Sequence, residues 1–237
     1  MSVDIGIVLT GTINPNISSV VHTDPAKRKV EYLDALNFYQ VFAPVYFLEN
    51  SSFPLLMDSD FKVFRNVSLR KVPPAKLPER GKGYMELDMI KKWIESESNL
   101  PSRFIKITGR YIIKNFKPIF EESLRQPENC ILIDQYKRGG IALTWLFYCG
   151  TNYYCDNLLE VYQACDDRID DWIERVLFRR LSQLPLNCRF FREEPLIEVV
   201  DGITGKKCSD GFIKHQLKQT LRIFNRLIDK KYLYLRG

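Results

Sequence analysis

The sequence predicts an α/β fold in which a mostly parallel sheet is flanked by helices and is followed by a basic amphipathic helix at the C-terminus. Short apolar runs, typical of buried strands, alternate with amphipathic helical segments along most of the chain. Small or polar residues follow several of these runs, as expected where parallel strands enter loops at one edge of a sheet. With 237 residues, 45% of them hydrophobic and 13% aromatic, the chain is long and apolar enough for a large core and is not disordered.

The predicted elements follow from the period of the apolar residues. Six segments are predicted as strands: Ile5–Leu9, Pro44–Leu48, Phe61–Val67, Arg103–Ile107, Cys130–Ile133 and Ala142–Cys149. Helices are predicted at Arg28–Tyr39, at Tyr84–Ser96, in a charged region from Asp156 to Leu184, and in the C-terminal segment. A hairpin is expected around Asp201 and Gly202.

The net charge of +6 is concentrated at the C-terminus. From Lys206 to Gly237 there are nine basic and two acidic residues, a net charge of +7. The other 205 residues carry 26 basic and 27 acidic side chains, a net charge of −1. This asymmetry predicts one catalytic-sized domain, residues 1–205, and a basic helical extension, residues 206–237.

The C-terminal helix combines an apolar stripe with a basic ladder. The stripe is formed by Ile213, Leu217, Leu221, Phe224 and Ile228, and the ladder by Lys214, Lys218, Arg222 and Arg226. Such a helix is suited to an anionic membrane surface or an acidic acceptor. The alternative is a helix that is docked on the core and keeps one face in solvent. A nucleic-acid partner is not expected, because no recognisable binding module accompanies the basic residues.

Cysteine usage and the N-terminus predict a cytoplasmic protein. The first residues contain no basic segment and are interpreted as a core strand, not as a signal peptide. No apolar run is long enough to span a bilayer, so any membrane association is expected to be peripheral, at the inner membrane. Six scattered cysteines and two histidines offer no zinc-ligand spacing.

Polar residues at the ends of the predicted strands are candidates for binding a ligand. They are Thr10, Gly11 and Thr12 after the first strand, Glu49 after the second, Thr108, Gly109, Arg110 and Tyr111 after the fourth, and Asp134 after the fifth. Arg110 could clamp a diphosphate through its fork of donors. The alternatives are a tight turn at Gly11, a surface acid at Glu49 and a structural ion pair at Arg110.

Two further candidates lie at helix starts. Gly81-Lys82-Gly83 opens a predicted helix and could contact phosphate through exposed amides and one cation, although a capped helix start is the alternative. Glu174 could serve as a general base, since a carboxylate is the expected base in a chain with two histidines. Its alternative is a helix-end acid with arginine partners.

No metal is expected. Asp58-Ser59-Asp60 matches the D-x-D pattern that holds divalent cations, but it precedes the strands after which such a motif is expected, and a solvated turn is favoured. Mg²⁺ or Mn²⁺ would bind only if Asp58 and Asp60, or Asp134, proved to be ligands. The dinucleotide signature G-x-G-x-x-G and the P-loop signature are both absent.

Several of these segments together resemble bacterial GT-A-type glycosyltransferases, which use nucleotide sugars to build capsule or lipopolysaccharide. The resemblance is carried by residues 5–10, 28–36, 49–51, 81–86, 104–111 and 171–174. It implies a Rossmann-type, GT-A-like sheet, with Thr10–Thr12 and Glu49 lining the nucleotide and Lys82 near its phosphates. It also implies that Glu174 matches the acid near the acceptor.

One departure from that family matters. Where the family usually has D-x-D, after the strand Phe104–Ile107, this chain has Thr108-Gly109-Arg110-Tyr111. The resemblance therefore implies a metal-independent variant in which Arg110 or Lys106 neutralises the leaving diphosphate. If Glu174 is the base, in-line attack inverts the configuration at the anomeric carbon. The expected reaction moves a hexosyl unit from a nucleotide sugar to a lipid-linked or oligosaccharide acceptor. A nucleotidyltransferase and a non-catalytic membrane-surface binding module are the alternatives.

Overall fold

The computed structural model describes residues 4–14, 23–51, 63–136, 139–184, 188–200, 207–209 and 212–228. Within these ranges the main sheet has seven strands in the order β3-β2-β1-β4-β7-β6-β8. Their bounds are β1 Ile5–Gly11, β2 Val45–Glu49, β3 Val67–Lys71, β4 Arg103–Thr108, β6 Ile131–Tyr136, β7 Ile141–Gly150 and β8 Cys188–Arg189. All neighbours are parallel except β7, which is antiparallel to both β4 and β6. The predicted α/β class with a mostly parallel sheet is confirmed.

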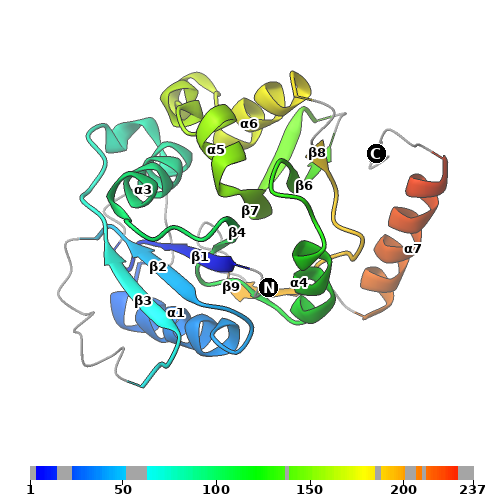
Figure 1. Ribbon diagram of the computed structural model, residues 1–237, viewed down its shortest axis with the longest axis horizontal. Helices are drawn as coiled ribbons and strands as arrows, with labels where there is room; N and C mark the ends of the chain where they lie inside the picture. The colour runs from blue at the N-terminus through cyan, green and yellow to red at the C-terminus, as the bar shows by residue number, and fades with distance from the viewer. Residues whose placement is uncertain are drawn as a thin grey trace.

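Helices cover both faces of this sheet (Figure 1). One face is covered by α1 (Pro25–Tyr39) and α4 (Phe116–Leu124), and the other by α3 (Lys82–Ser96), α5 (Thr151–Asn157) and α6 (Ile173–Ser182). Short 3₁₀ turns lie at η1 (Pro78–Arg80), η2 (Val161–Ala164) and η3 (Asp167–Ile169). The last helix, α7 (Phe212–Ile228), lies at the periphery (Figure 1).

Two apolar cores result from the alternation of side chains along the strands. Val8 and Phe104 belong to the cluster beneath α3, α5 and α6. Ile7 and Ile105, one residue away on the same strands, belong to the cluster beneath α1 and α4. Because both faces are covered, these strands are almost continuously apolar, which is the pattern that predicted them.

A small antiparallel sheet of order β10-β9-β5 lies beside the main one in the described part of the chain. It comprises β5 (Ile112–Ile113), β9 (Ile197–Val200) and β10 (Lys207–Ser209). The pairing of β9 with β10 fits the predicted hairpin, although Asp201 and Gly202 themselves lie outside the described residues. It also joins residues 207–209 of the predicted extension to the body, while the division into residues 1–205 and 206–237 stays a prediction.

One element prediction is wrong and another is confirmed only in part. The strand predicted at Phe61–Val67 begins only at Val67, because Val63–Asn66 lie in turns and bends. The charged helical region predicted from Asp156 to Leu184 is confirmed in part. It contains the end of α5, the turns η2 and η3, and α6, but buried Cys165 and the paired backbones of Asp166 and Asp171 interrupt it. The helix α4 was not predicted.

The orientation of α7 corrects a third prediction. Arg222, expected on an exposed basic ladder, is only 2% exposed and binds the carboxylates of Asp134 and Glu194. The Lys218 ammonium nitrogen lies 3.8 Å from Glu194 Oε1, on the same side of the helix. The two buried carboxylates attract this side of α7, so the middle of the ladder faces the protein body.

The other side of α7 faces away from the body. Leu217 is 61% exposed and Leu221 is 55% exposed, while Lys214 at the start of the helix is exposed as predicted. The side chain of Arg226 lies outside the described residues. No helix in the described ranges is both long and apolar enough to cross a membrane.

Candidate functional site

A buried polar network lies at the edge of the sheet where β1 and β4 end. Its centre is Lys106, which is 1% exposed and lies 2.7 Å from Glu86 Oε1 of α3. The Lys106 ammonium also donates to Thr108 Oγ1 at 3.2 Å and to the Thr144 carbonyl at 2.7 Å. Glu86 in turn accepts a hydrogen bond of 2.5 Å from the hydroxyl of Thr10. The network therefore joins β1, β4, β7 and α3.

The charge of Lys106 is held inside the protein by its partners. Burial lowers the pKa of this lysine, and the negative charges of Glu86 and Glu174 oppose that effect. An ammonium group has three protons, and Lys106 has three acceptors at hydrogen-bond distance. The geometry thus fits a buried ammonium paired with a carboxylate.

Glu174 is connected to this network through Thr144. It lies in the first turn of α6, and its Oε1 accepts a hydrogen bond of 3.3 Å from the Thr144 hydroxyl. Burial raises the pKa of Glu174, the charge of Glu86 raises it further, and Thr144 and Lys106 oppose the rise. A carboxylate with a raised pKa is a stronger general base than an exposed one, so the geometry suits the predicted role of Glu174.

A second polar network holds the end of β1 on the other face of the sheet. The Arg28 guanidinium of α1 donates to the carbonyls of Thr12 and Ile13 at distances from 2.5 to 3.1 Å. The Thr12 amide donates to the Tyr32 hydroxyl at 3.0 Å, and the Thr12 hydroxyl donates to Asn50 Oδ1 at 2.7 Å. Predicted residue Thr12 is therefore held rigidly beside the end of β2.

Glu49 is a buried acid, not the surface acid of the alternative interpretation. It is 3% exposed, and its Oε1 accepts from the Ile13 amide at 3.2 Å and from the amide and hydroxyl of Ser51. Burial raises the pKa of Glu49, while the hydrogen bonds from Ser51 and Ile13 lower it. Glu49 thus joins the loops that follow β1 and β2, and its contact with a nucleotide stays a prediction.

Arg110 lies apart from Lys106. Its Nη1 is 2.7 Å from Glu31 Oε2 of α1, and the side chain is almost completely buried. Because α1 and α3 cover opposite faces of the sheet, Arg110 and Lys106 lie on different sides of it. The geometry therefore favours the structural ion pair over a clamp on the same phosphates as Lys106.

The glycines at the start of α3 are required by packing. The Asp167 carboxylate lies against this helix start, where burial raises its pKa and the backbone and charge of Lys82 oppose the rise. Gly81 has φ of 106°, and a Cβ there would lie 1.9 Å from Asp167 Oδ2. A Cβ on Gly83 would lie 2.4 Å from Ile173 Cβ of α6. The capped helix start, the alternative to a phosphate-binding turn, matches this geometry.

The remaining predicted residues are dispersed. Gly109 donates its amide to the Thr10 carbonyl at 2.8 Å and holds the ends of β1 and β4 together. Gly11 packs against Tyr32 and Phe47, and Tyr111 lies against the ring of Trp145.

Asp134 is not part of the Lys106 network, because both of its carboxylate oxygens bind Arg222 of α7. Asp58 and Asp60 lie outside the described residues. Among the residues that the structure describes, no group of His, Cys, Asp or Glu side chains has the arrangement of a metal site.

Two members of the Lys106 network, Glu86 and Thr144, were not predicted as site residues. Thr144 carried a signal, since it is a polar residue inside the apolar run of β7. For Glu86 the indication is weaker: it lies four residues after Lys82, and therefore on the same side of the same helix as a predicted site residue. The spacing alone does not show that these two side chains meet Lys106.

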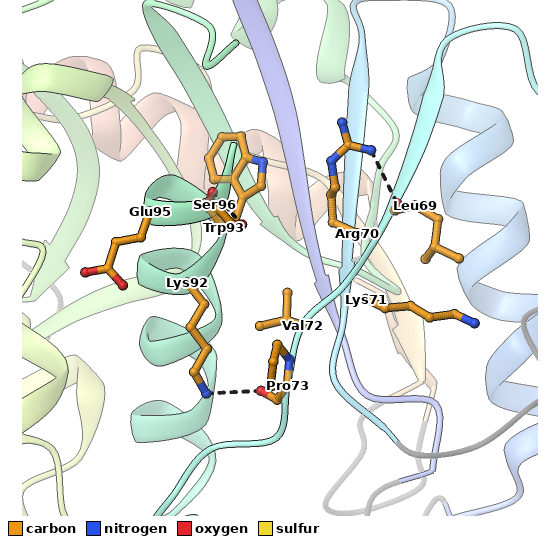
Figure 2. A pocket seen from close by; sticks show the side chains of 9 residues that line it. All are labelled: Leu69, Arg70, Lys71, Val72, Pro73, Lys92, Trp93, Glu95 and Ser96. Atoms are coloured by element: carbon orange, nitrogen blue, oxygen red, sulfur yellow. Dashed lines mark hydrogen bonds between the residues drawn. The ribbon is translucent and has the colours of Figure 1, made fainter. Parts of the chain in front are cut away.

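An open hollow of about 430 Å³ lies elsewhere, between β3 and the C-terminal turns of α3 (Figure 2). It is lined by Leu69, Arg70, Lys71, Val72, Pro73, Lys92, Trp93, Glu95 and Ser96. Two of its cations have internal partners, since Arg70 binds Glu97 and Lys92 binds Asp88. Glu86 lies near the opposite end of α3, so the hollow is distinct from the Lys106 network.

No protein-family model matches the chain, and no curated protein matches it. Solved structures with a similar arrangement include a protein described as a nucleotide-diphospho-sugar transferase from Desulfovibrio desulfuricans G20. That match has 10% identity over 79% of each chain and a TM-score of 0.49. The glycosyltransferase GlyE of Streptococcus pneumoniae TIGR4 matches at 8% identity over 78% of this chain and 45% of its own, with a TM-score of 0.49. Mouse xyloside xylosyltransferase 1 matches at 10% identity over 78% and 83%, with a TM-score of 0.42. At these values the similarities establish no family membership and no activity.

Proposed function

We propose that this chain is a glycosyltransferase that moves a hexosyl unit from a nucleotide sugar to a hydroxyl group of a glycan or a lipid-linked acceptor. The observation that carries the proposal is Glu174, a carboxylate with a raised pKa beside the buried Lys106–Glu86 pair. These groups lie at the edge where the parallel strands β1 and β4 end, the usual ligand-binding edge of such sheets. The resemblance in sequence to GT-A-type enzymes supports the same reaction.

In the proposed mechanism, the nucleoside lies along the ends of β1 and β2, near Thr10–Thr12 and Glu49. Glu174 removes the proton from the acceptor hydroxyl as its oxygen attacks the anomeric carbon. The bond between that carbon and the diphosphate oxygen breaks, and the nucleoside diphosphate leaves with the electron pair. Attack in line with the leaving group inverts the configuration at the anomeric carbon.

We propose that transfer needs no metal and that the buried Lys106 ammonium stabilises the leaving diphosphate through its charge and not by a hydrogen bond, because its three protons already have acceptors. The sequence predicts either Lys106 or Arg110 for this role. Lys106 is the better placed of these two, because Arg110 binds Glu31 on the other face of the sheet. Activity should persist in EDTA. Loss of activity that Mg²⁺ or Mn²⁺ restores would refute metal independence and direct attention to Asp58 and Asp60.

The decisive experiment compares Glu174→Gln with Glu121→Gln, an exposed glutamate of α4. Thermal-shift measurements with UDP-, GDP-, CMP- and dTDP-sugars first identify the donor. Glu174→Gln should then bind the donor like the wild type but lose transfer, while Glu121→Gln keeps both. Full turnover in Glu174→Gln would refute the base assignment. Release of pyrophosphate in place of a nucleoside diphosphate would identify a nucleotidyltransferase.

We further propose that the enzyme works in surface-polysaccharide synthesis at the cytoplasmic face of an anionic membrane. Exposed Leu217 and Leu221 form the contact, with Lys214 beside them and Lys230 and Lys231 following in the sequence. Flotation with vesicles of phosphatidylethanolamine and phosphatidylglycerol should recover the wild type but not Leu217→Ser/Leu221→Ser. Equal flotation of both proteins would exclude α7 as the contact.

A further inference from the structure

We propose that the loop formed by residues 166–172 is an acceptor subsite that binds a neutral sugar ring against the indole of Trp172. This inference rests on the proposed function, since it names the class of acceptor that Glu174 would deprotonate. The loop lies between buried Cys165 and the first turn of α6, which carries Glu174.

Two large apolar side chains of this loop face solvent. Ile169 is 69% exposed and Trp172 is 41% exposed, whereas Trp93 of α3 is 1% exposed. Exposing an indole ring to water is unfavourable, and aromatic side chains that remain exposed often lie at binding surfaces. The location matters here, because Trp172 is the residue that caps the N-terminus of α6, two positions before Glu174.

The loop is held in one conformation by its own polar groups. The backbones of Asp166 and Asp171 exchange two hydrogen bonds, of 2.8 and 3.1 Å. The Asp166 carboxylate accepts from the Arg168 side chain at 2.7 and 2.9 Å, and Asp170 adopts a left-handed conformation with φ of 66°. A loop fixed in this way loses little conformational freedom when a ligand binds.

The indole itself is also positioned. The Arg175 guanidinium lies 4.6 Å from the centroid of the Trp172 ring and is held by an ion pair with Asp170. The next residue, Ile173, packs against Gly83 and anchors the first turn of α6 on α3. Trp172 and Glu174 are therefore fixed at the same end of the same helix.

The chemistry of this surface fits a neutral sugar. A pyranose ring presents an apolar face of C–H groups, which packs against an aromatic ring, and a rim of hydroxyls, which bond to polar groups. From Asp166 to Glu174 the sequence has five acidic residues and one arginine. Three of these acids are paired with arginines, Asp166 with Arg168, Asp170 with Arg175 and Asp171 with Arg179. Because these guanidinium groups already bind carboxylates, an acceptor ring that carries phosphate or carboxylate would have to compete with them, and a neutral ring is favoured.

Acrylamide quenching of tryptophan fluorescence tests the subsite without any turnover. The probes are the methyl glycosides of glucose, galactose and N-acetylglucosamine, with methyl glucuronide as the acidic comparison. At least one neutral glycoside should shield the wild type from quenching, and methyl glucuronide should not. Shielding should be retained in Trp145→Phe and lost in Trp172→Phe. Shielding that survives in Trp172→Phe, or no shielding of the wild type by any neutral probe, would overturn the proposal.

Kinetics separate this subsite from the proposed reaction. With a glycoside that accepts sugar, Trp172→Ala should raise the acceptor KM by roughly tenfold, and Trp172→Phe should recover most of the loss. The donor KM should not change, because Trp172 contacts only the acceptor. An unchanged acceptor KM refutes the subsite even if transfer occurs. Shielding by neutral glycosides without any transfer would leave the sugar site standing and refute the glycosyltransferase.

Discussion

Replacing Arg222 with Met should strongly destabilise the protein. The Arg222 guanidinium lies between two carboxylates, with Nη1 and Nη2 2.9 and 2.6 Å from the oxygens of Asp134 and Nη2 2.5 Å from Glu194 Oε2. It also donates to the Phe191 carbonyl at 2.7 Å. The side chains of all three charged residues are less than a tenth exposed. Methionine fills part of the volume but leaves the buried Asp134 carboxylate without Arg222 and removes the nearer cation beside Glu194, since Lys218 lies 3.8 Å from that carboxylate.

The cost follows from this geometry. Removing one partner of a buried ion pair costs about 3–5 kcal/mol, because the remaining charge is uncompensated. A domain of ordinary stability unfolds with about 5–15 kcal/mol, so the loss is a large fraction of the total. The variant Arg222→Met/Asp134→Asn/Glu194→Gln neutralises both carboxylates as well and should recover most of the loss.

Urea denaturation at neutral pH, followed by circular dichroism, measures these differences. The matched control is Lys214→Met, which removes an exposed cation from the same helix and should change the free energy of unfolding by less than about 0.5 kcal/mol. If Arg222→Met were as stable as Lys214→Met, Arg222 would not be buried between the two carboxylates. The orientation described for α7 would then be refuted.

Three further outcomes are expected near the candidate site. Lys106→Met should lower the free energy of unfolding by about 3 kcal/mol in urea denaturation, because Glu86 loses its buried cation, and a loss below about 1 kcal/mol would contradict the pairing. Gly83→Ala should lower it by about 1–3 kcal/mol, since the new methyl group would lie 2.4 Å from Ile173 Cβ. The acidic limb of the kcat/KM profile should lie above pH 4.5, because burial raises the pKa of Glu174 and the base acts only when deprotonated. A limb below that pH would exclude Glu174 as the base.

The fold was largely predictable because the sheet is covered on both faces. Such strands must be apolar at nearly every position, and β1, β4 and β7 therefore stand out in the sequence. The edge strand β3, Val-Ser-Leu-Arg-Lys, is only half-buried and lacks that pattern, so its position was predicted wrongly. The spacing of apolar residues therefore identifies a strand only where both of its faces, or one of them, are buried.

The candidate site was predictable only in part. Strand ends predicted Thr10 and Thr108, because parallel strands bring their carboxyl ends to one edge, and the resemblance to GT-A-type enzymes added Lys106. The pairing of Lys106 with Glu86 depends on how α3 packs across β4, and the hydroxyl that connects Thr144 to Glu174 depends on how α6 packs on β7. These contacts are set by tertiary packing, which the spacing of residues along one element does not encode.

Tertiary packing also decides the orientation of α7, and with it which partners its basic residues bind. Helical spacing shows an apolar stripe and a basic ladder, but partners 88 and 28 positions away, Asp134 and Glu194, decide which side faces the body. Once Arg222 is buried, the period of 3.6 residues places Leu217 and Leu221 outward. Burying a fully exposed leucine is worth about 1.5–3 kcal/mol, and more than half of that exposure remains at Leu217 and Leu221, so an apolar environment would stabilise this face more than water does. Part of the C-terminal charge therefore neutralises carboxylates inside the protein, and the membrane contact that we propose depends more on these leucines than on the whole charge of the segment.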